Sequence, residues 1–346
     1  MHALVIHAPH DLRLDTISSD NAALAPNDVR VRMAAGGICG SDLHYYHHGG
    51  FGVVRIKEPM TLGHEASGHV EAVGSAVKNF NKGDLVAVNP SNPCGTCASC
   101  VGGQQQHCEN MLFNGSAMRF PHVQGLFRDR VTVSHKRVFK IDAAVSAAEA
   151  SLCEPFSVTL HAANQAGDLR GKTVLVSGCG PIGILSIVSA RLAGAKRIVA
   201  TDITTHSLNV AAKFGCDECI DVSKGVDGLA HLTDKRGQID VAFECSGNPH
   251  AMRAVIATLK PRGRMVLVGL GGDAEVPMNM IVAKELEIVG TFRFNEEFGR
   301  AAELISTRKV DLKPMLSETF PMTAATDAFA LASDRNRATK VVIALS

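Results

Sequence analysis

The chain has 346 residues, more than the ~250 to 300 at which a single hydrophobic core stops growing, so we expect two domains. Hydrophobic residues make up 46% and charged residues 20%, and 35 basic against 34 acidic side chains leave a formal net charge of +1. This balance disfavours nucleic acids and membranes as partners and favours a small-molecule ligand. The N-terminal segment lacks the basic and apolar stretches of a signal peptide, which predicts a cytoplasmic protein.

The first ~150 residues predict a mostly antiparallel β domain. Short runs in which apolar and polar residues alternate are separated by glycine and aspartate, for example DVRVRMA, GHVEAVG and GDLVAVN. Alternation with a period of two is typical of strands that have one buried face.

Two glycine-rich segments of this domain carry candidate metal ligands. Cys39 lies in GGICGSDLHYY, and His64 and Glu65 follow Gly63 in TLGHEASGHV. Another carboxylate, Glu154, begins an apolar helical run in SLCEPFSVTL. A thiolate, an imidazole and a carboxylate leave a fourth zinc position for water or substrate, which is typical of a catalytic zinc. The alternative is a small buried cysteine and an ordinary buried histidine.

Polar residues next to these ligands offer further roles. Asp42 could hold His64 in the required tautomer, and Ser41 and His44 could carry a proton outward. Alternatively, Ser41 and Asp42 cap a helix that begins at Leu43. The two interpretations are compatible.

A cysteine cluster follows in SNPCGTCASCVGGQQQHCEN, with the spacing C-x2-C-x2-C-x7-C. In a reducing compartment such clusters bind metal more often than they form disulfides. Four thiolates close a tetrahedral zinc site and leave no position for substrate. We therefore predict a structural zinc held by Cys94, Cys97, Cys100 and Cys108.

From Lys172 onward the sequence predicts alternating strands and helices. A β-branched strand, a glycine turn, an apolar helix and a second strand ending at Asp202 follow one another. The turn matches G-x-G-x-x-G, in which glycine lets the backbone approach a pyrophosphate at the helix N-terminus, and Asp202 would bond the ribose hydroxyls. The predicted cofactor-binding residues of the turn are Gly178, Gly180, Pro181, Ile182 and Gly183.

Later strands would complete a doubly wound parallel sheet of six strands. We expect them at Cys219–Val222, Ile239–Cys245, Met265–Val268 and Glu285–Phe292. Ligands of such sheets bind beyond the carboxyl ends of the strands. The residues expected to face the nicotinamide are therefore Ser246, Val268 and Gly269.

The order of these motifs along the whole chain resembles that of the zinc-dependent medium-chain alcohol and polyol dehydrogenases. The resemblance implies a GroES-like, mostly β catalytic domain (1–153 and 294–346, with the zinc lobe at 90–110) and a Rossmann domain (154–293). It also implies two zinc ions per chain, NAD with NADP possible, and a homo-oligomer, either a dimer or a tetramer. Ser41 and His44 would relay the proton of the substrate hydroxyl.

Within the family, GGICGSDLHYY, FNGSAMRFPHVQG and GTFRFNEEF are most similar to enzymes that act on sugar acids and polyols. The likeness implies reversible oxidation of L-idonate to 5-keto-D-gluconate, with a sorbitol or xylitol dehydrogenase as the alternative. Either Glu65 or Glu154 would be the third zinc ligand. Relatives often carry an arginine four or five residues after the ribose-binding acid, where this chain has His206 and Ser207. Candidates for the outer substrate pocket are Tyr45, Arg119 and Arg293.

Two other classes remain open at this point. A zinc-free reductase on the same fold would have no use for the metal ligands, and a non-catalytic dinucleotide-binding structural protein would not need to keep them. Zinc content, together with reduction of the nicotinamide by a polyol or sugar acid, distinguishes all three.

Overall fold

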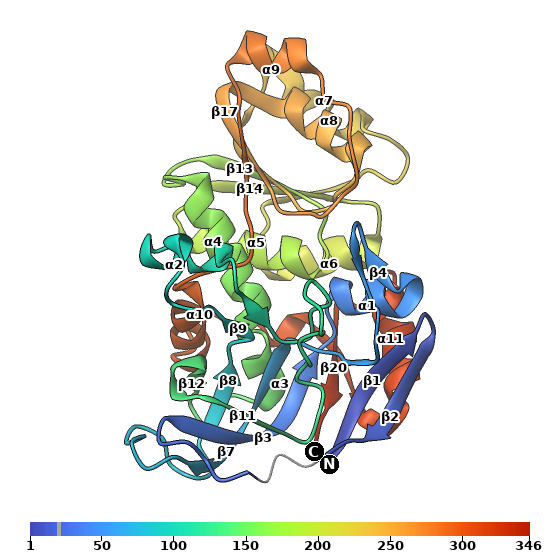
Figure 1. Ribbon diagram of the computed structural model, residues 1–346. Helices are drawn as coiled ribbons and strands as arrows, with labels where there is room; N and C mark the ends of the chain where they lie inside the picture. The colour runs from blue at the N-terminus through green and yellow to red at the C-terminus, as the bar shows by residue number, and fades with distance from the viewer. Residues whose placement is uncertain (19–21) are drawn as a thin grey trace. The chain divides into compact units, whose positions relative to one another are not determined.

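The computed structural model describes residues 1–18 and 22–346, which form two units (Figure 1). Unit 1 comprises Met1–Glu154, Phe298–Asp334 and Lys340–Ser346, and unit 2 comprises Pro155–Glu297 and Arg335–Thr339. The boundaries expected at 153/154 and 293/294 differ from these by one and four residues. The short segment Arg335–Thr339, which belongs to unit 2, has no counterpart in the expected division.

Unit 1 is organised around a seven-stranded sheet. Its order is β12 (Val138–Lys140), β8 (Leu85–Val88), β7 (Glu65–Val73), β3 (Asp28–Gly37), β20 (Lys340–Ala344) and β19 (Leu316–Pro321), with β11 (Arg130–Ser134) also paired to β3. All pairs are antiparallel except β19 with β20. Strand β20 lies beside β3 although the two come from opposite ends of the chain (Figure 1). The predicted mostly antiparallel β domain is confirmed.

Smaller elements surround this sheet. A second sheet has the order β2 (Asp11–Thr16), β1 (His2–Ala8) and β6 (Met60–Thr61), and two short ribbons join β4 (Gly50–Phe51) to β5 (Val54–Arg55) and β9 (Ser91–Asn92) to β10 (Leu112–Phe113). The helices are α1 (Gly40–His48), α2 (Ala98–Val101), η1 (Gln105–His107), η2 (His135–Arg137), α3 (Ala147–Ser151), α10 (Glu297–Ser306, which begins in unit 2), η5 (Lys313–Met315), η6 (Met322–Ala324) and α11 (Ala325–Ser333).

Unit 2 contains a six-stranded sheet in which every pair is parallel. Its order is β15 (Glu218–Asp221), β14 (Arg197–Asp202), β13 (Thr173–Ser177), β16 (Ile239–Glu244), β17 (Leu259–Leu267) and β18 (Glu287–Gly290). Counted from β13, this is the order 3-2-1-4-5-6 of dinucleotide-binding sheets. The predicted Rossmann fold is confirmed.

Buried aliphatic side chains cover both faces of this sheet. One cluster includes Val174, Val176 and Ile187, and the other includes Leu175, Val199 and Ile256. The helices of the unit are α4 (Cys153–Ala166, which begins in unit 1), α5 (Pro181–Leu192), α6 (Thr205–Lys213), η3 (Asp227–Leu229), α7 (Ala230–Thr233), η4 (Asp234–Arg236), α8 (Pro249–Thr258) and α9 (Met278–Lys284).

Three of the four later strands expected from sequence lie within two residues of β15, β16 and β18. The fourth, expected at Met265–Val268, is only the end of β17, which begins at Leu259. The pairing of β17 with β16 shifts register between Ile239 and Val241 of β16, so the first half of β17 is not regularly paired with β16. Within the described part of the chain, no helix combines the length and the apolarity needed to cross a bilayer.

Candidate functional site

The candidate catalytic ligands meet where two neighbouring strands of unit 1 end and begin. Strand β3 ends at Gly37, which pairs with Glu65 at the start of β7. Cys39 is the N-cap of α1, two residues beyond β3, and His64 immediately precedes β7. The Cys39 sulfur, one ring nitrogen of His64 and one carboxylate oxygen of Glu65 all lie within 4.8 Å of one another. The structure therefore brings together three of the four predicted ligands.

Glu154, the other candidate carboxylate, is buried in the first turn of α4 and is not part of that three-atom set. Burial, followed by the negative charges of Glu65 and Cys39, raises its pKa to about 8, although His64 opposes the shift. Burial and the charge of Glu65 also raise the pKa of Cys39 to about 12. Three acidic groups crowded into a buried site are better accommodated with a cation among them, which fits a divalent metal.

Asp42 is fully buried, and its position differs from the expected one. Its carboxylate accepts hydrogen bonds from the backbone N–H groups of Cys39 (3.0 Å) and Gly63 (3.2 Å). Its oxygen lies 3.9 Å from Nδ1 of His64, too far for a hydrogen bond. Asp42 therefore lies beside His64 without a hydrogen bond to it, and its oxygens instead bind the backbone of both ligand segments. That Asp42 holds the His64 tautomer stays a prediction.

Nδ1 of His64 is buried and has no hydrogen-bond partner among the described residues. A buried polar atom without a partner costs free energy, and binding a cation would remove that cost. The donor set of sulfur, imidazole and carboxylate is one that zinc prefers. On these observations the residues present fit a zinc ion.

Lys340, which the sequence analysis did not identify, completes this cluster. Its ammonium donates to both oxygens of Glu65 (2.8 and 2.7 Å) and to the Ile38 carbonyl (3.0 Å). Both side chains are buried, with 2% of Lys340 and 1% of Glu65 exposed. Burial alone would lower the pKa of Lys340, but Glu65 and Cys39 raise it above its usual value. The lysine thus stays charged and holds Glu65 in place.

Helix α1 carries the other candidate catalytic residues. It begins at Gly40, not at Leu43 as the capping alternative assumed, and Asp42 lies in its first turn. Ser41 is half-buried and His44 is exposed, and residues three apart lie on the same side of a helix. Ser41 and His44 thus lead from the buried ligand end of α1 toward solvent.

The three candidate pocket residues have different surroundings. Tyr45 is buried, and its hydroxyl accepts a hydrogen bond from the N–H of Ala117 at 3.0 Å. Arg119 is exposed in unit 1. Arg293 belongs to unit 2, where its guanidinium lies 4.9 Å from the ring centre of Phe292. Tyr45 supports the segment that leads to Arg119.

The four cysteines of the predicted lobe converge. All four sulfurs lie within 4.8 Å of one another: Cys94, Cys97, Cys100 and Cys108. Backbone N–H groups point at these sulfurs, at 3.2 Å for Cys94 N–H to Cys108 and 3.4 Å for Cys97 N–H to Cys94. Hydrogen bonds from the backbone and hydroxyl of Thr96 lower the pKa of Cys94 to about 5. N–H groups aimed at sulfur favour thiolates, and thiolates are the form that binds zinc.

The glycine turn of unit 2 joins β13 to α5. A Cβ on Gly183 would lie 1.8 Å from the Gly178 carbonyl oxygen, and a Cβ on Gly178 would lie 2.9 Å from the backbone of Ser246. Gly180 is different: apart from its chain neighbours, no heavy atom of the described residues lies within 4 Å of such a Cβ. Gly180 is also the N-cap of α5, followed by Pro181 and Ile182. Open space before a helix N-terminus fits a pyrophosphate.

Asp202 ends β14 and already holds the turn in place. One oxygen accepts from the N–H of Cys179 at 2.7 Å, and the other accepts from the N–H and hydroxyl of Thr204 at 2.8 and 3.0 Å. A carboxylate has about four acceptor sites, so capacity for ribose hydroxyls remains. His206 lies on α6 with its ring 3.3 Å from the Thr339 hydroxyl.

The loops after β16 and β17 contain the remaining cofactor candidates. Ser246 donates its N–H to the carboxylate of Glu244 at 3.0 Å, and its hydroxyl bonds the same oxygen. Glu244 is buried and also accepts from the N–H of Gly247, so it shapes this loop although the sequence analysis did not identify it. Val268 and Gly269 donate their N–H groups to the Glu244 carbonyl at 2.9 and 2.8 Å.

Two family models match the chain: the alcohol dehydrogenase GroES-like domain at residues 25–143 and the zinc-binding dehydrogenase domain at residues 181–307. L-idonate 5-dehydrogenase (NAD(P)(+)) of Escherichia coli strain K12 is 39% identical, with 91% of each chain covered. The chain belongs to the zinc-binding alcohol dehydrogenase family. Sorbitol dehydrogenase of Bacillus subtilis is 33% identical, over 99% of this chain and 97% of the relative.

The crystal structure of the E. coli L-idonate 5-dehydrogenase superimposes with a TM-score of 0.93 at 36% identity, over 99% of this chain and 97% of that chain. Membership of this zinc-binding dehydrogenase family confirms the expected fold class and the expected enzyme class, a zinc-dependent dehydrogenase of the alcohol and polyol type. It also confirms zinc and a nicotinamide dinucleotide as the expected cofactors.

Proposed function

We propose that this dehydrogenase oxidises a secondary hydroxyl of a sugar acid, with L-idonate and 5-keto-D-gluconate as the substrate and product of a reversible reaction. The observation that carries the proposal is the set of half-buried Cys39, buried His64 and a buried carboxylate, which can hold a metal with a position left open. The substrate assignment is supported by the likeness to L-idonate 5-dehydrogenase along almost the whole chain.

Cys39 and His64 would hold the catalytic zinc with Glu65 or Glu154, while the four-cysteine lobe would hold the structural one. A zinc ion bound at the first site supplies a Lewis acid that lowers the pKa of the substrate hydroxyl. Glu65 belongs to the set of three atoms within 4.8 Å of one another, and Lys340 restrains it. Zinc content of the Glu65→Gln and Glu154→Gln variants identifies the ligand, because only loss of the true ligand should release metal.

The protein's own part in the reaction is to remove a proton. We propose that Ser41 accepts the proton of the substrate hydroxyl and passes it to His44, which is exposed and can release it to water. A nicotinamide dinucleotide supplies the hydride acceptor. Its pyrophosphate would lie against Gly180 at the start of α5, and the loops that contain Ser246 and Gly269 would face the nicotinamide.

We propose a preference for NAD over NADP, because the negative charge of Asp202 at the end of β14 would repel a 2′-phosphate. His206, where relatives often have arginine, would tolerate that phosphate better when its ring is protonated. Comparison of kcat/KM for the two cofactors at pH 8 and pH 6 tests both statements. A clear NADP preference at pH 8 would contradict the first.

Arg119 and Arg293 are our candidates for binding the substrate carboxylate, since a guanidinium offers it two parallel hydrogen bonds. Arg119 is exposed and lies in the idonate-like segment. Arg119→Ala should lose about 1.5 to 3 kcal/mol of transition-state binding with L-idonate and little with sorbitol. Equal losses with both substrates would remove Arg119 from this role.

A polyol dehydrogenase acting on sorbitol or xylitol is the second candidate, because the sorbitol dehydrogenase of B. subtilis matches the chain over nearly its full length. A panel of L-idonate, D-gluconate, sorbitol, xylitol and L-threonine with both nicotinamide cofactors distinguishes the two. Higher kcat/KM on sorbitol than on L-idonate would replace the sugar acid with the polyol. We further propose that the protein is cytoplasmic and forms a homo-oligomer. Light scattering of the purified protein would test the oligomeric state.

A further inference from the structure

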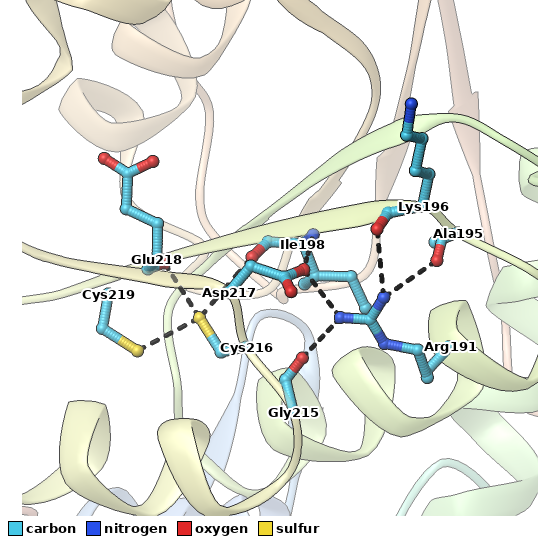
Figure 2. Close-up of polar contacts among 9 residues, drawn as sticks. All are labelled: Arg191, Ala195, Lys196, Ile198, Gly215, Cys216, Asp217, Glu218 and Cys219. Atoms are coloured by element: carbon cyan, nitrogen blue, oxygen red, sulfur yellow. Dashed lines mark hydrogen bonds and ion pairs between the residues drawn. The ribbon is translucent and has the colours of Figure 1, made fainter.

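Two cysteines outside the proposed zinc sites lie in contact with each other in unit 2. The sulfur of Cys216 is 3.1 Å from the sulfur of Cys219. Figure 2 draws this contact as a dashed line. The pair has C-x-x-C spacing in the segment GCDEC. Cys219 is exposed and Cys216 is half-buried, so a dissolved reagent reaches the first and finds the second directly behind it.

The end of α6 explains this contact. Residues three apart on one strand point to opposite faces, so two cysteines at this spacing would normally be separated. Here β15 begins only at Glu218, and Cys216 precedes it in a helix-ending turn. Gly215 has a φ of +86°, and the N–H groups of Gly215 and Cys216 donate to carbonyls in the last turn of α6 at 3.2 and 3.4 Å. This turn directs Cys216 toward Cys219.

A salt bridge holds the segment between the two cysteines (Figure 2). Arg191 donates to the carboxylate of Asp217 at 2.7 Å and to the Gly215 carbonyl at 2.6 Å. The same carboxylate accepts the N–H of Ile198, at the start of β14, at 2.7 Å. Because Asp217 is anchored on two sides, its neighbour Cys216 has little freedom to move away from Cys219.

We propose that Cys216 and Cys219 form a reversible disulfide by exchange with a small-molecule disulfide. The exposed Cys219 thiolate attacks one sulfur of the small disulfide, whose S–S bond breaks and releases one small thiol. The Cys216 sulfur then attacks the Cys219 sulfur of the mixed disulfide, the bond to the small molecule breaks, and the departing small thiolate takes up the Cys216 proton and leaves as the second small thiol. Two protein thiols are oxidised and one small disulfide is reduced, so two hydrogens leave the protein.

Little rearrangement is needed for this step. A disulfide bond is about 2.05 Å long, so the two sulfurs must approach each other by about 1 Å. Burial, and then contact with Cys219, raises the pKa of Cys216 to about 12. A thiolate that is poorly stabilised is a poor leaving group, which favours the disulfide over the dithiol once it has formed.

The experiment uses the full chain loaded with zinc, so that the four lobe cysteines are protected by metal. The protein is exposed to oxidised glutathione, the remaining thiols are alkylated, and trypsin releases residues 214–224, FGCDECIDVSK, with both cysteines in one peptide. We expect most of this peptide to be two hydrogens lighter and unalkylated, and to become doubly alkylated after dithiothreitol. A zinc indicator should record no metal release. Cys245 is the internal control, and its sulfur lies 3.6 Å from the Ser186 hydroxyl. The peptide that contains Cys245 should be recovered either alkylated or with one glutathione attached.

Two variants test the order of attack. Cys216→Ser should accumulate glutathione on Cys219, because the second step is blocked. Cys219→Ser should react about tenfold more slowly at Cys216, because Cys216 is less exposed and its burial, the largest cause of its raised pKa, remains in this variant. The proposal is overturned if the wild-type peptide stays doubly alkylated, or if it carries one glutathione on each cysteine.

Discussion

Glu65 and Lys340 form an ion pair that is almost completely removed from water. Removing one partner of such a pair leaves the other charge without compensation in the interior. Lys340→Met should therefore lower the free energy of unfolding by about 3 to 5 kcal/mol, measured by urea denaturation. The double variant Lys340→Met/Glu65→Gln should recover a large part of that loss, because no unpaired charge remains. Additive losses in the double variant would show that the two residues are not coupled.

Glu297 provides a pH dependence within unit 2. Burial opposes its ionisation, but hydrogen bonds from His161 (2.9 Å) and from the N–H of Asn295 (2.8 Å) prevail and lower its pKa to about 2. Since the folded-state pKa lies below the usual 4.5, ionised Glu297 stabilises the fold above about pH 4.5, and this stabilisation is lost as pH falls toward 2.

Replacement of Glu297 by glutamine should therefore lower Tm most at pH 7, and the difference from wild type should shrink at pH 4.5 and again at pH 3. The neighbouring Glu296 is exposed, and Glu296→Gln is the matched control, with little effect expected at any of these pH values. A difference that grows as pH falls would have the wrong sign for this linkage.

At the scale of single elements, Gly180, the N-cap of α5, and Gly183, in the first turn of α5, have opposite surroundings and make a matched pair. Gly180→Ala places a methyl group in the open space proposed for the pyrophosphate, so KM for the dinucleotide should rise about tenfold or more with Tm nearly unchanged. Gly183→Ala forces a Cβ to within 1.8 Å of a backbone oxygen and should prevent stable folding. An unchanged KM in folded Gly180→Ala would exclude a phosphate at that position.

The cysteine lobe and the Cys39 set predict different consequences of losing one zinc. Cys100→Ser should lose one zinc per chain and lower Tm by about 5 °C or more, because the ion organises a segment with little regular structure of its own. Cys39→Ser should also lose one zinc but keep its Tm, since β3 and β7 are paired without the ion, and should lose activity. Metal analysis, thermal unfolding and turnover of both variants decide this. Similar unfolding of both would refute the division.

At the scale of the whole molecule, the sequence predicts the features whose residues lie close together in the chain and misses those whose residues lie far apart. The glycine turn and the four-cysteine lobe are contained in short segments whose spacing is set by the ligand, so their geometry could be anticipated. Lys340 could not, because its partner lies 275 residues away and nothing near it indicates an ion pair. The sequence shows that Asp42 is polar and close to a ligand. That its carboxylate accepts hydrogen bonds from backbone N–H groups and not from His64 depends on how the segment before β7 lies against α1.

The position of β20 has a consequence for the order of folding. This strand lies between β3 and β19, and the bond from Lys340 to the Ile38 carbonyl joins residues 302 positions apart. The six-stranded sheet of unit 2, by contrast, is formed within one continuous segment. As the chain is synthesised, that sheet can close while the seven-stranded sheet still lacks β19 and β20, and contacts between distant residues form slowly. In pulse-labelled hydrogen exchange during refolding, the amides of β13, β14 and β16 should therefore be protected before those of β3 and β20.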